Sequence, residues 1–135
     1  MPLAATAHGP LHVEIIDQVV PWRRPGLPVL FHHGIGASAE IWAGWRAALA
    51  DAHRLVVFDM RGYGRSAIPA ADFAWSLALL VDDLFAVADA AGLERFHLVG
   101  ESIGGTVALA AALARPERVA TLTVSNGAHL GASIQ

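Results

Sequence analysis

The sequence contains no cysteine, which excludes disulfide bonds, thiolate metal ligands and a cysteine nucleophile. It also contains no block of lysine or arginine, and its net charge is −3 with seven histidines. This charge pattern does not favour nucleic acid or an anionic membrane as a partner. No apolar run approaches the length of a membrane span, and residues 1–10 lack a basic segment followed by an apolar one. We therefore expect a cytoplasmic protein that binds neither nucleic acid nor a membrane.

The chain is rich in apolar residues and shows no internal boundary. Of its 135 residues, 55% are hydrophobic and 16% are charged, which is enough to form one domain with a buried core. No repeat or low-complexity tract divides the sequence. We therefore expect residues 1–135 to form a single domain.

Short runs of β-branched and apolar residues alternate with stretches of helical periodicity. The expected strands are residues 11–20 (one strand or a short hairpin), 29–33, 54–59, 96–99 and 119–124. The expected helices contain residues 41–49, residues 77–88 with Asp72 as N-cap and Gly92 after the end, and the stretch from Ser102 to Pro116. This alternation predicts an α/β fold with a mostly parallel sheet and helices on both faces.

The loops after the expected strands are the expected place of a functional site. In parallel sheets of this kind, ligands bind beyond the carboxyl ends of the strands. These loops are residues 33–38, 59–69, 100–104 and 125–130. We expect them to converge on one edge of the sheet.

Residues 100–104 carry the most informative pattern, Gly-Glu-Ser-Ile-Gly between an apolar strand and an alanine-rich helix. Such a strand, tight turn and helix place a serine at the apex, and the flanking positions are too crowded for a Cβ. The pattern predicts Ser102 as a nucleophile and the Ile103 N–H, at a helix N-terminus, as a donor to a developing oxyanion. The alternative interpretation is that Ser102 is only a helix N-cap.

A second glycine turn, Gly34-Ile35-Gly36, follows the strand at 29–33. We expect this turn to direct the Ile35 N–H toward the same oxyanion, while His33 braces the turn. The Ile35 and Ile103 amides would then form a two-donor oxyanion hole.

The turn at 34–36 also fits the G-x-G-x-x-A pattern of a dinucleotide-binding loop. Asp59 lies 25 residues after Gly34, near where an acid that binds the ribose would fall. Two histidines stand directly before the first glycine, however, and this interpretation leaves the turn around Ser102 unexplained. We therefore keep NAD(P) binding as a less favoured alternative.

Three motifs together resemble the α/β-hydrolase fold superfamily, over about residues 11–128. They are His33-Gly34-Ile35-Gly36, Asp59-Met60-Arg61-Gly62-Tyr63-Gly64-Arg65-Ser66 and Gly100-Glu101-Ser102-Ile103-Gly104-Gly105. A serine at the nucleophile position argues against the haloalkane dehalogenase and epoxide hydrolase branches, which carry aspartate there. The resemblance leaves the esterase, lactonase, C–C hydrolase and cofactor-free haloperoxidase group.

The resemblance implies a serine hydrolase that acts on a small carboxylic ester or lactone without a metal or cofactor. Ser102 matches the nucleophile, and Ile35 and Ile103 match the oxyanion donors. The supporting positions are His33, Gly34, Gly36, Gly100, Gly104, Gly105, Asp59 and Arg61.

The chain departs from this superfamily in length. Family members are about twice as long, and their acid and histidine follow the serine in chain order. We therefore expect the fold to be truncated after the sixth strand and the 135-residue chain to be nearly inactive alone. His129 is the one geometrically sensible spare base. The alternative from another class is a non-catalytic fragment or interaction module.

Three further expectations concern side chains and the edge of the sheet. We expect Arg61 and Arg65 to pair with Asp59 or to brace its loop, with binding of a substrate carboxylate as the less favoured alternative. We expect Asp82 and Asp83 to belong to a solvated helix face. Residues 119–124 would form an uncovered apolar edge strand. This edge predicts self-association or a missing C-terminal half supplied by further chain.

Overall fold

The computed structural model describes residues 3–127, which form one six-stranded sheet flanked by helices. The strands are β1 (Leu3–Ala4), β2 (Leu11–Ile16), β3 (Val29–His32), β4 (Leu55–Phe58), β5 (Phe96–Glu101) and β6 (Val119–Ser125). The α-helices are α1 (Ala43–Leu49), α2 (Leu77–Ala90) and α3 (Ile103–Ala114), with 3₁₀ turns at Ala39–Trp42 and Pro116–Arg118. This is the predicted α/β architecture.

The sheet has the strand order β1-β2-β4-β3-β5-β6 and is mostly parallel. Strands β4, β3, β5 and β6 run parallel to one another, whereas β1 and β2 are antiparallel to their neighbours. All residues of β3 and β4 are buried, because helices cover both faces of the sheet. Strands β4 and β5 lie on opposite sides of β3, so the connection from β4 to β5 crosses over β3.

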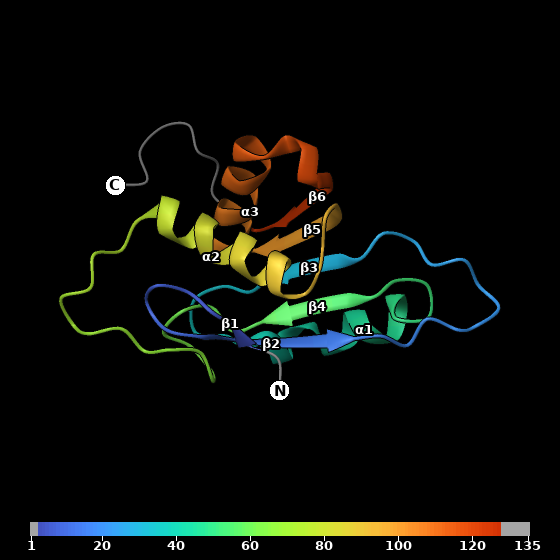
Figure 1. Ribbon diagram of the computed structural model, residues 1–135, viewed down its shortest axis with the longest axis horizontal. Helices are drawn as coiled ribbons and strands as arrows, with labels where there is room; N and C mark the ends of the chain where they lie inside the picture. Colours follow the sequence, from blue (N-terminus) through green and yellow to red (C-terminus); the bar gives the residue numbers. More distant parts are fainter. Residues whose placement is uncertain (1–2, 128–135) are drawn as a thin grey trace.

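Alternate side chains of the central strands enter two separate cores. Leu30, Val56 and Leu98 pack toward α2 and α3, whereas Phe31 and Val57 pack toward α1 and the turn before it. Figure 1 shows α2 and α3 together on one side of the sheet and α1 on the other. Because successive side chains of a strand point to opposite faces of the sheet, each central strand packs against both helical layers.

Several element boundaries differ from the sequence prediction. Helix α2 begins at Leu77, and its N-cap is Ser76, whose Oγ accepts a hydrogen bond from the Leu79 N–H at 3.0 Å. The prediction that Asp72 caps this helix is therefore wrong, because residues 72–76 are not helical. Strand β2 ends at Ile16, so residues 17–20 do not extend it, and the two-residue β1 was not predicted.

Strand β6 lies at one end of the sheet, and within residues 3–127 its only partner is β5. Val124 on this strand is 41% exposed.

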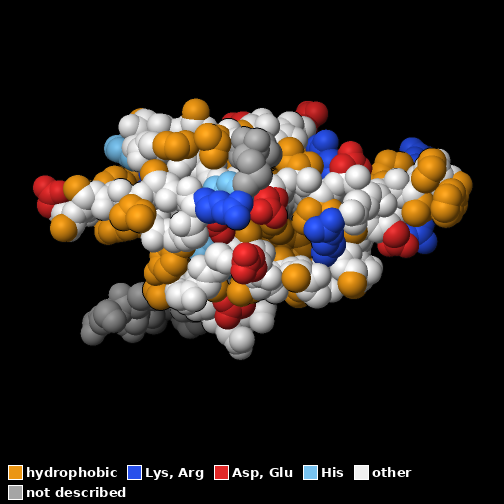
Figure 2. All heavy atoms as spheres, turned by 90° about the horizontal axis from the view of Figure 1, so that it is seen from below, with side chains coloured by type: hydrophobic (Ala, Val, Ile, Leu, Met, Phe, Trp, Pro, Cys, Tyr) orange, Lys and Arg blue, Asp and Glu red, His pale blue; other side chains and the backbone are white. Residues whose placement is uncertain are grey.

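The described helices include none that is long and apolar enough to cross a membrane. On the face shown in Figure 2, basic and acidic side chains lie interspersed among apolar ones.

Candidate active site

Ser102 lies at the joint between β5 and α3, in a backbone conformation that L-residues rarely adopt. Its φ is 57° and its ψ is −125°, and its N–H donates to the Ser125 carbonyl oxygen at 2.9 Å. Although Ser102 occupies the N-cap position, its side chain makes no capping hydrogen bond to α3. The geometry therefore favours the strained elbow over the alternative of a simple helix cap.

The glycines around Ser102 allow three backbone segments to meet closely. A Cβ on Gly100 would lie 2.6 Å from the Gly104 carbonyl carbon, and one on Gly104 would lie 2.5 Å from the His33 carbonyl oxygen. A Cβ on Gly105 would lie 2.7 Å from Cγ1 of Val124 on β6. These contacts explain why the turn carries glycine at all three positions.

The glycine turn after β3 lies directly beside the elbow. A Cβ on Gly34 would lie 2.8 Å from the Ser102 Cβ. Within residues 3–127, neither the Ile35 N–H nor the Ile103 N–H donates a hydrogen bond to the protein. The two loops that meet at Ser102 thus each contain a backbone N–H that has no acceptor among these residues.

His33 braces this turn with both ring nitrogens. The Met60 N–H donates to Nε2 at 2.8 Å, so the proton of the neutral ring is on Nδ1, which donates to the Gly34 carbonyl oxygen at 2.7 Å. Burial lowers the pKa of His33 below 6.5, opposed by its hydrogen bond to Gly34 and by the charges of Asp59 and Glu101. A neutral His33 with both nitrogens occupied is not available as the base for Ser102.

Asp59 joins the loops that follow β3 and β4. Its buried carboxylate accepts hydrogen bonds from the Ala39 N–H at 2.8 Å and the Arg65 N–H at 3.0 Å. The Ser66 hydroxyl donates to the Asp59 carbonyl oxygen and accepts from the His12 N–H. Because both carboxylate oxygens have internal donors, Asp59 is poorly placed to bind a ribose, which weighs against the dinucleotide alternative.

Arg61 is fully buried and pairs with Asp83 on α2 rather than with Asp59. Two hydrogen bonds of 2.9 and 2.8 Å join the guanidinium to the Asp83 carboxylate, and two more reach the His8 carbonyl oxygen and the Thr6 hydroxyl. The prediction of a solvated face is therefore wrong for Asp83, which Arg61 draws into the interior, whereas Asp82 is exposed.

A pocket of about 370 Å³ opens between the two glycine loops and the start of α2. Its lining residues are Ile35, Met60, Tyr63, Trp75, Ser76, Leu77, Leu80 and Ile103. The sequence did not single out Met60, Tyr63, Leu77 or Leu80 as site residues, although the first two lie inside the 59–66 motif. Ile35 and Ile103, whose N–H groups have no acceptor among residues 3–127, both line this pocket.

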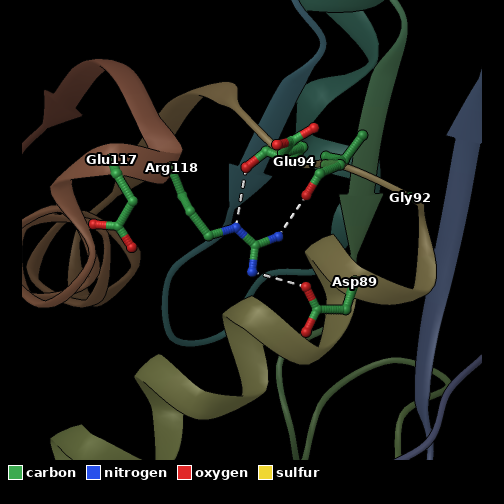
Figure 3. A pocket seen from close by; sticks show the side chains of 6 residues that line it. Asp89, Gly92, Glu94, Glu117 and Arg118 are labelled. Atoms are coloured by element: carbon green, nitrogen blue, oxygen red, sulfur yellow. Dashed lines mark hydrogen bonds and ion pairs between the residues drawn. The ribbon is translucent and has the colours of Figure 1, made fainter.

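A larger hollow lies at the opposite edge of the sheet, before β5 and β6 (Figure 3). Arg118 crosses it, with Nη1 2.8 Å from the Asp89 carboxylate and Nε donating to the Glu94 carbonyl oxygen at 3.0 Å. Its remaining nitrogen donates to the Leu93 carbonyl oxygen. Because these groups satisfy one another, this hollow is a structural junction rather than the candidate site.

The structure gives Ser102 no base among the described residues. No histidine in residues 3–127 forms a hydrogen bond with Ser102, and His129 lies outside the described residues. Burial lowers the pKa of His32 to about 4, and its Nδ1 lies 2.8 Å from the His33 carbonyl oxygen. The described part of the chain also contains no cluster of three or more side chains suited to a metal ion.

The comparisons with known proteins agree with this fold and motif order. The family model described as "alpha/beta hydrolase fold" matches residues 28–133. "Putative carbamate hydrolase RutD" of Klebsiella pneumoniae is 41% identical over 108 residues, and "2-hydroxymuconate semialdehyde hydrolase" of Pseudomonas sp. strain CF600 is 40% identical over 106 residues. The alignments cover 79% and 76% of this chain but 40% and 37% of those relatives.

A solved structure shows the same relation. The enol-lactonase from Burkholderia xenovorans LB400 superposes with a TM-score of 0.82 at 26% identity, covering 94% of this chain and 47% of that one. The chain thus spans less than half the length of these relatives. By fold, motif order and family match, the chain belongs to the α/β-hydrolase fold family.

Proposed function

We propose that this chain carries the nucleophile and oxyanion hole of a serine hydrolase that acts on a small carboxylic ester or lactone. One observation carries the proposal. Ser102 has a strained backbone at the β5–α3 joint, and the loops that hold the undonated Ile35 and Ile103 amides meet there. A serine nucleophile and oxyanion donors are two of the three parts that acyl transfer through a serine requires, and the third is a base.

The proposed reaction proceeds through an acyl-enzyme. The Ser102 oxygen attacks the carbonyl carbon, and the carbonyl electron pair moves to the oxygen, which the Ile35 and Ile103 N–H groups stabilise. Collapse of this intermediate breaks the bond to the leaving alkoxide, which takes up the serine proton, and water then hydrolyses the acyl-enzyme. Loss of one oxyanion donor typically costs about 3 kcal/mol of transition-state stabilisation.

The proton shuttle requires a base outside residues 3–127. A serine hydroxyl without a base is a weak nucleophile, and triad enzymes that lack a member retain only about 10³- to 10⁴-fold acceleration. We therefore propose that the 135-residue chain alone is nearly inactive. His129 is one candidate base, and a further segment of the kind that the longer relatives have is the other.

Relatives with similar folds support a hydrolytic function on small molecules, with differing substrates. The names of the relatives refer to a carbamate, a semialdehyde and an enol-lactone. We favour an ester or lactone because the residues that line the pocket beside the two glycine loops are mostly apolar. A cytoplasmic location remains the expectation for such an enzyme.

Turnover of a restored chain tests this proposal. The chain is fused to the C-terminal part of one of its longer relatives, and hydrolysis of p-nitrophenyl butyrate is measured beside the same fusion with Ser102→Ala. We expect measurable turnover that the substitution reduces by at least about 10³-fold. Equal turnover in both fusions would contradict the role of Ser102. No turnover in either would favour the non-catalytic alternative.

A further inference from the structure

We infer that the pocket between the two glycine loops selects an uncharged, apolar substituent on the reacting carbonyl. The inference rests on the proposed function and names the substrate class for the same site. Ile35 and Ile103 both line this pocket, and their backbone N–H groups are the proposed oxyanion donors. A substrate whose carbonyl oxygen accepted hydrogen bonds from these two amides would therefore have its carbonyl carbon beside this pocket.

The lining itself offers almost no polar group. Six of its eight residues are aliphatic, methionine or tryptophan: Ile35, Met60, Trp75, Leu77, Leu80 and Ile103. The Ser76 hydroxyl accepts a hydrogen bond from the Leu79 N–H at the start of α2. The Tyr63 ring packs edge-on against His33 with a centroid separation of 5.8 Å. The pocket wall is therefore suited to burying hydrocarbon.

Among residues 3–127, the pocket lining contains no lysine, arginine or histidine that could neutralise a bound carboxylate. Arg61 lies between the lining residues Met60 and Tyr63 in sequence, but its guanidinium is fully buried and makes four hydrogen bonds to Asp83, His8 and Thr6. No other arginine lines the pocket. A carboxylate that enters this pocket would lose hydration without gaining a partner, which is strongly unfavourable.

Three of the apolar residues that line the pocket are also exposed to solvent. Ile35 is 69% exposed, Trp75 is 50% exposed and Leu77 is 38% exposed. Large apolar side chains gathered around a hollow commonly mark a place where a ligand or another part of a protein binds. At about 370 Å³, this hollow lies near the lower end of the range for small-molecule pockets.

Two esters of matched chain length test this inference on the 135-residue chain. Methyl hexanoate and monomethyl adipate differ by a terminal carboxylate, and each is titrated while the methyl NMR signals of isoleucine and leucine are recorded. We expect methyl hexanoate to shift the signals of Ile35, Leu77, Leu80 and Ile103. We expect monomethyl adipate to bind at least about tenfold more weakly, which corresponds to about 1.4 kcal/mol.

A charge placed in the pocket provides the second variant. Leu77→Arg is expected to reduce the preference for methyl hexanoate at least about threefold, because the guanidinium can pair with the adipate carboxylate. Leu113→Arg, a matched change at a residue of α3 that is 68% exposed and outside the pocket, is expected to leave the preference unchanged.

Three outcomes would overturn the inference: equal affinity for the two esters, shifts confined to residues outside the pocket, or no binding of either ester. The readout does not depend on Ser102 chemistry. If the chain binds the esters selectively but its fused form never hydrolyses an ester, the proposed function is contradicted and the inference is not. Turnover with a preference for the charged ester would remove the inference alone.

Discussion

Ser102 holds a φ of 57°, and its surroundings must compensate for the strain of that conformation. The compensation comes from close backbone packing, because Gly100 and Gly104 let the strand, the helix and the end of β3 approach within distances that no Cβ permits. Helix α3 and strand β5 then hold the serine from both sides. Several close backbone contacts together thus hold Ser102 in its strained conformation.

Gly104→Ala is predicted to destabilise the protein by at least about 2 kcal/mol, because its Cβ would collide with the His32 and His33 carbonyl groups. Gly44→Ala on α1 is the matched control, since a Cβ there meets nothing within 4 Å. This control is expected to raise stability by up to about 1 kcal/mol. Urea unfolding measures both, and similar effects of the two substitutions would refute the crowding argument.

His32 is predicted to make stability depend on pH. Burial lowers its folded pKa from 6.5 to about 4, so between these values the unfolded chain binds more protons than the folded one. Stability is therefore fully present above pH 6.5 and is lost as the pH falls toward 4, with about 2 kcal/mol lost between pH 7 and pH 5. Urea unfolding at both pH values should show a smaller loss for His32→Gln. An unchanged loss would count against this assignment.

At the scale of elements, buried polar contacts join segments that are distant in sequence. Asp59 connects the loops after β3 and β4 through the Ala39 and Arg65 amides. Arg61 connects the loop after β4 to α2 through Asp83 and to the N-terminal segment through His8. The walls of the pocket are therefore positioned by groups that do not line it.

Asp83→Ala is predicted to cost about 3–5 kcal/mol of stability, because it leaves the Arg61 guanidinium buried without its counterion. The neighbouring Asp82 is exposed, so Asp82→Ala should change stability by less than about 0.5 kcal/mol. Denaturant midpoints of the two variants provide the comparison. A tolerant Asp83 would show that this ion pair does not hold the loop to α2.

At the scale of the whole molecule, the sheet ends at β6, whose outer edge has no strand partner among residues 3–127. Strand β6 pairs with β5 alone and carries exposed positions along its length. Unpaired backbone groups on such an edge favour association with another strand. The same edge is the place where further strands would extend this sheet.

The 135-residue chain is predicted to self-associate through β6. Multi-angle light scattering should show species larger than 14.2 kDa, and Thr123→Lys should shift the distribution toward monomer, because a lysine on an edge strand disfavours pairing. Thr123 is exposed, so the substitution should preserve the fold. A monodisperse monomer for the unchanged chain would contradict the prediction.

The sequence was sufficient to predict the α/β fold because strand and helix periodicities are local and strong. It also brought the loops at 34–36, 59–66 and 100–104 to one edge, since parallel strands place their carboxyl ends together. Two features were beyond it for physical reasons. The burial of Asp83 depends on Arg61, 22 residues away in sequence, and a two-residue strand such as β1 carries no periodicity.

The pocket shows the same limit at the site. Helix α2 starts four residues later than an N-cap at Asp72 would give, so Trp75 lies before the helix and Leu77 is its first residue, and both line the pocket. Side chains from four separate segments enclose this space, and no local pattern specifies their meeting. The base that the proposed function requires for Ser102 likewise lies outside residues 3–127.

Covalent labelling tests whether Ser102 is a nucleophile. The chain fused to the C-terminal part of a longer relative is treated with a fluorophosphonate, and the modified peptide is identified by mass spectrometry beside the Ser102→Ala fusion. We expect one phosphonyl group on Ser102, absent from the variant and formed much more slowly on the 135-residue chain alone. A fused chain that folds but whose Ser102 remains unlabelled would contradict the account.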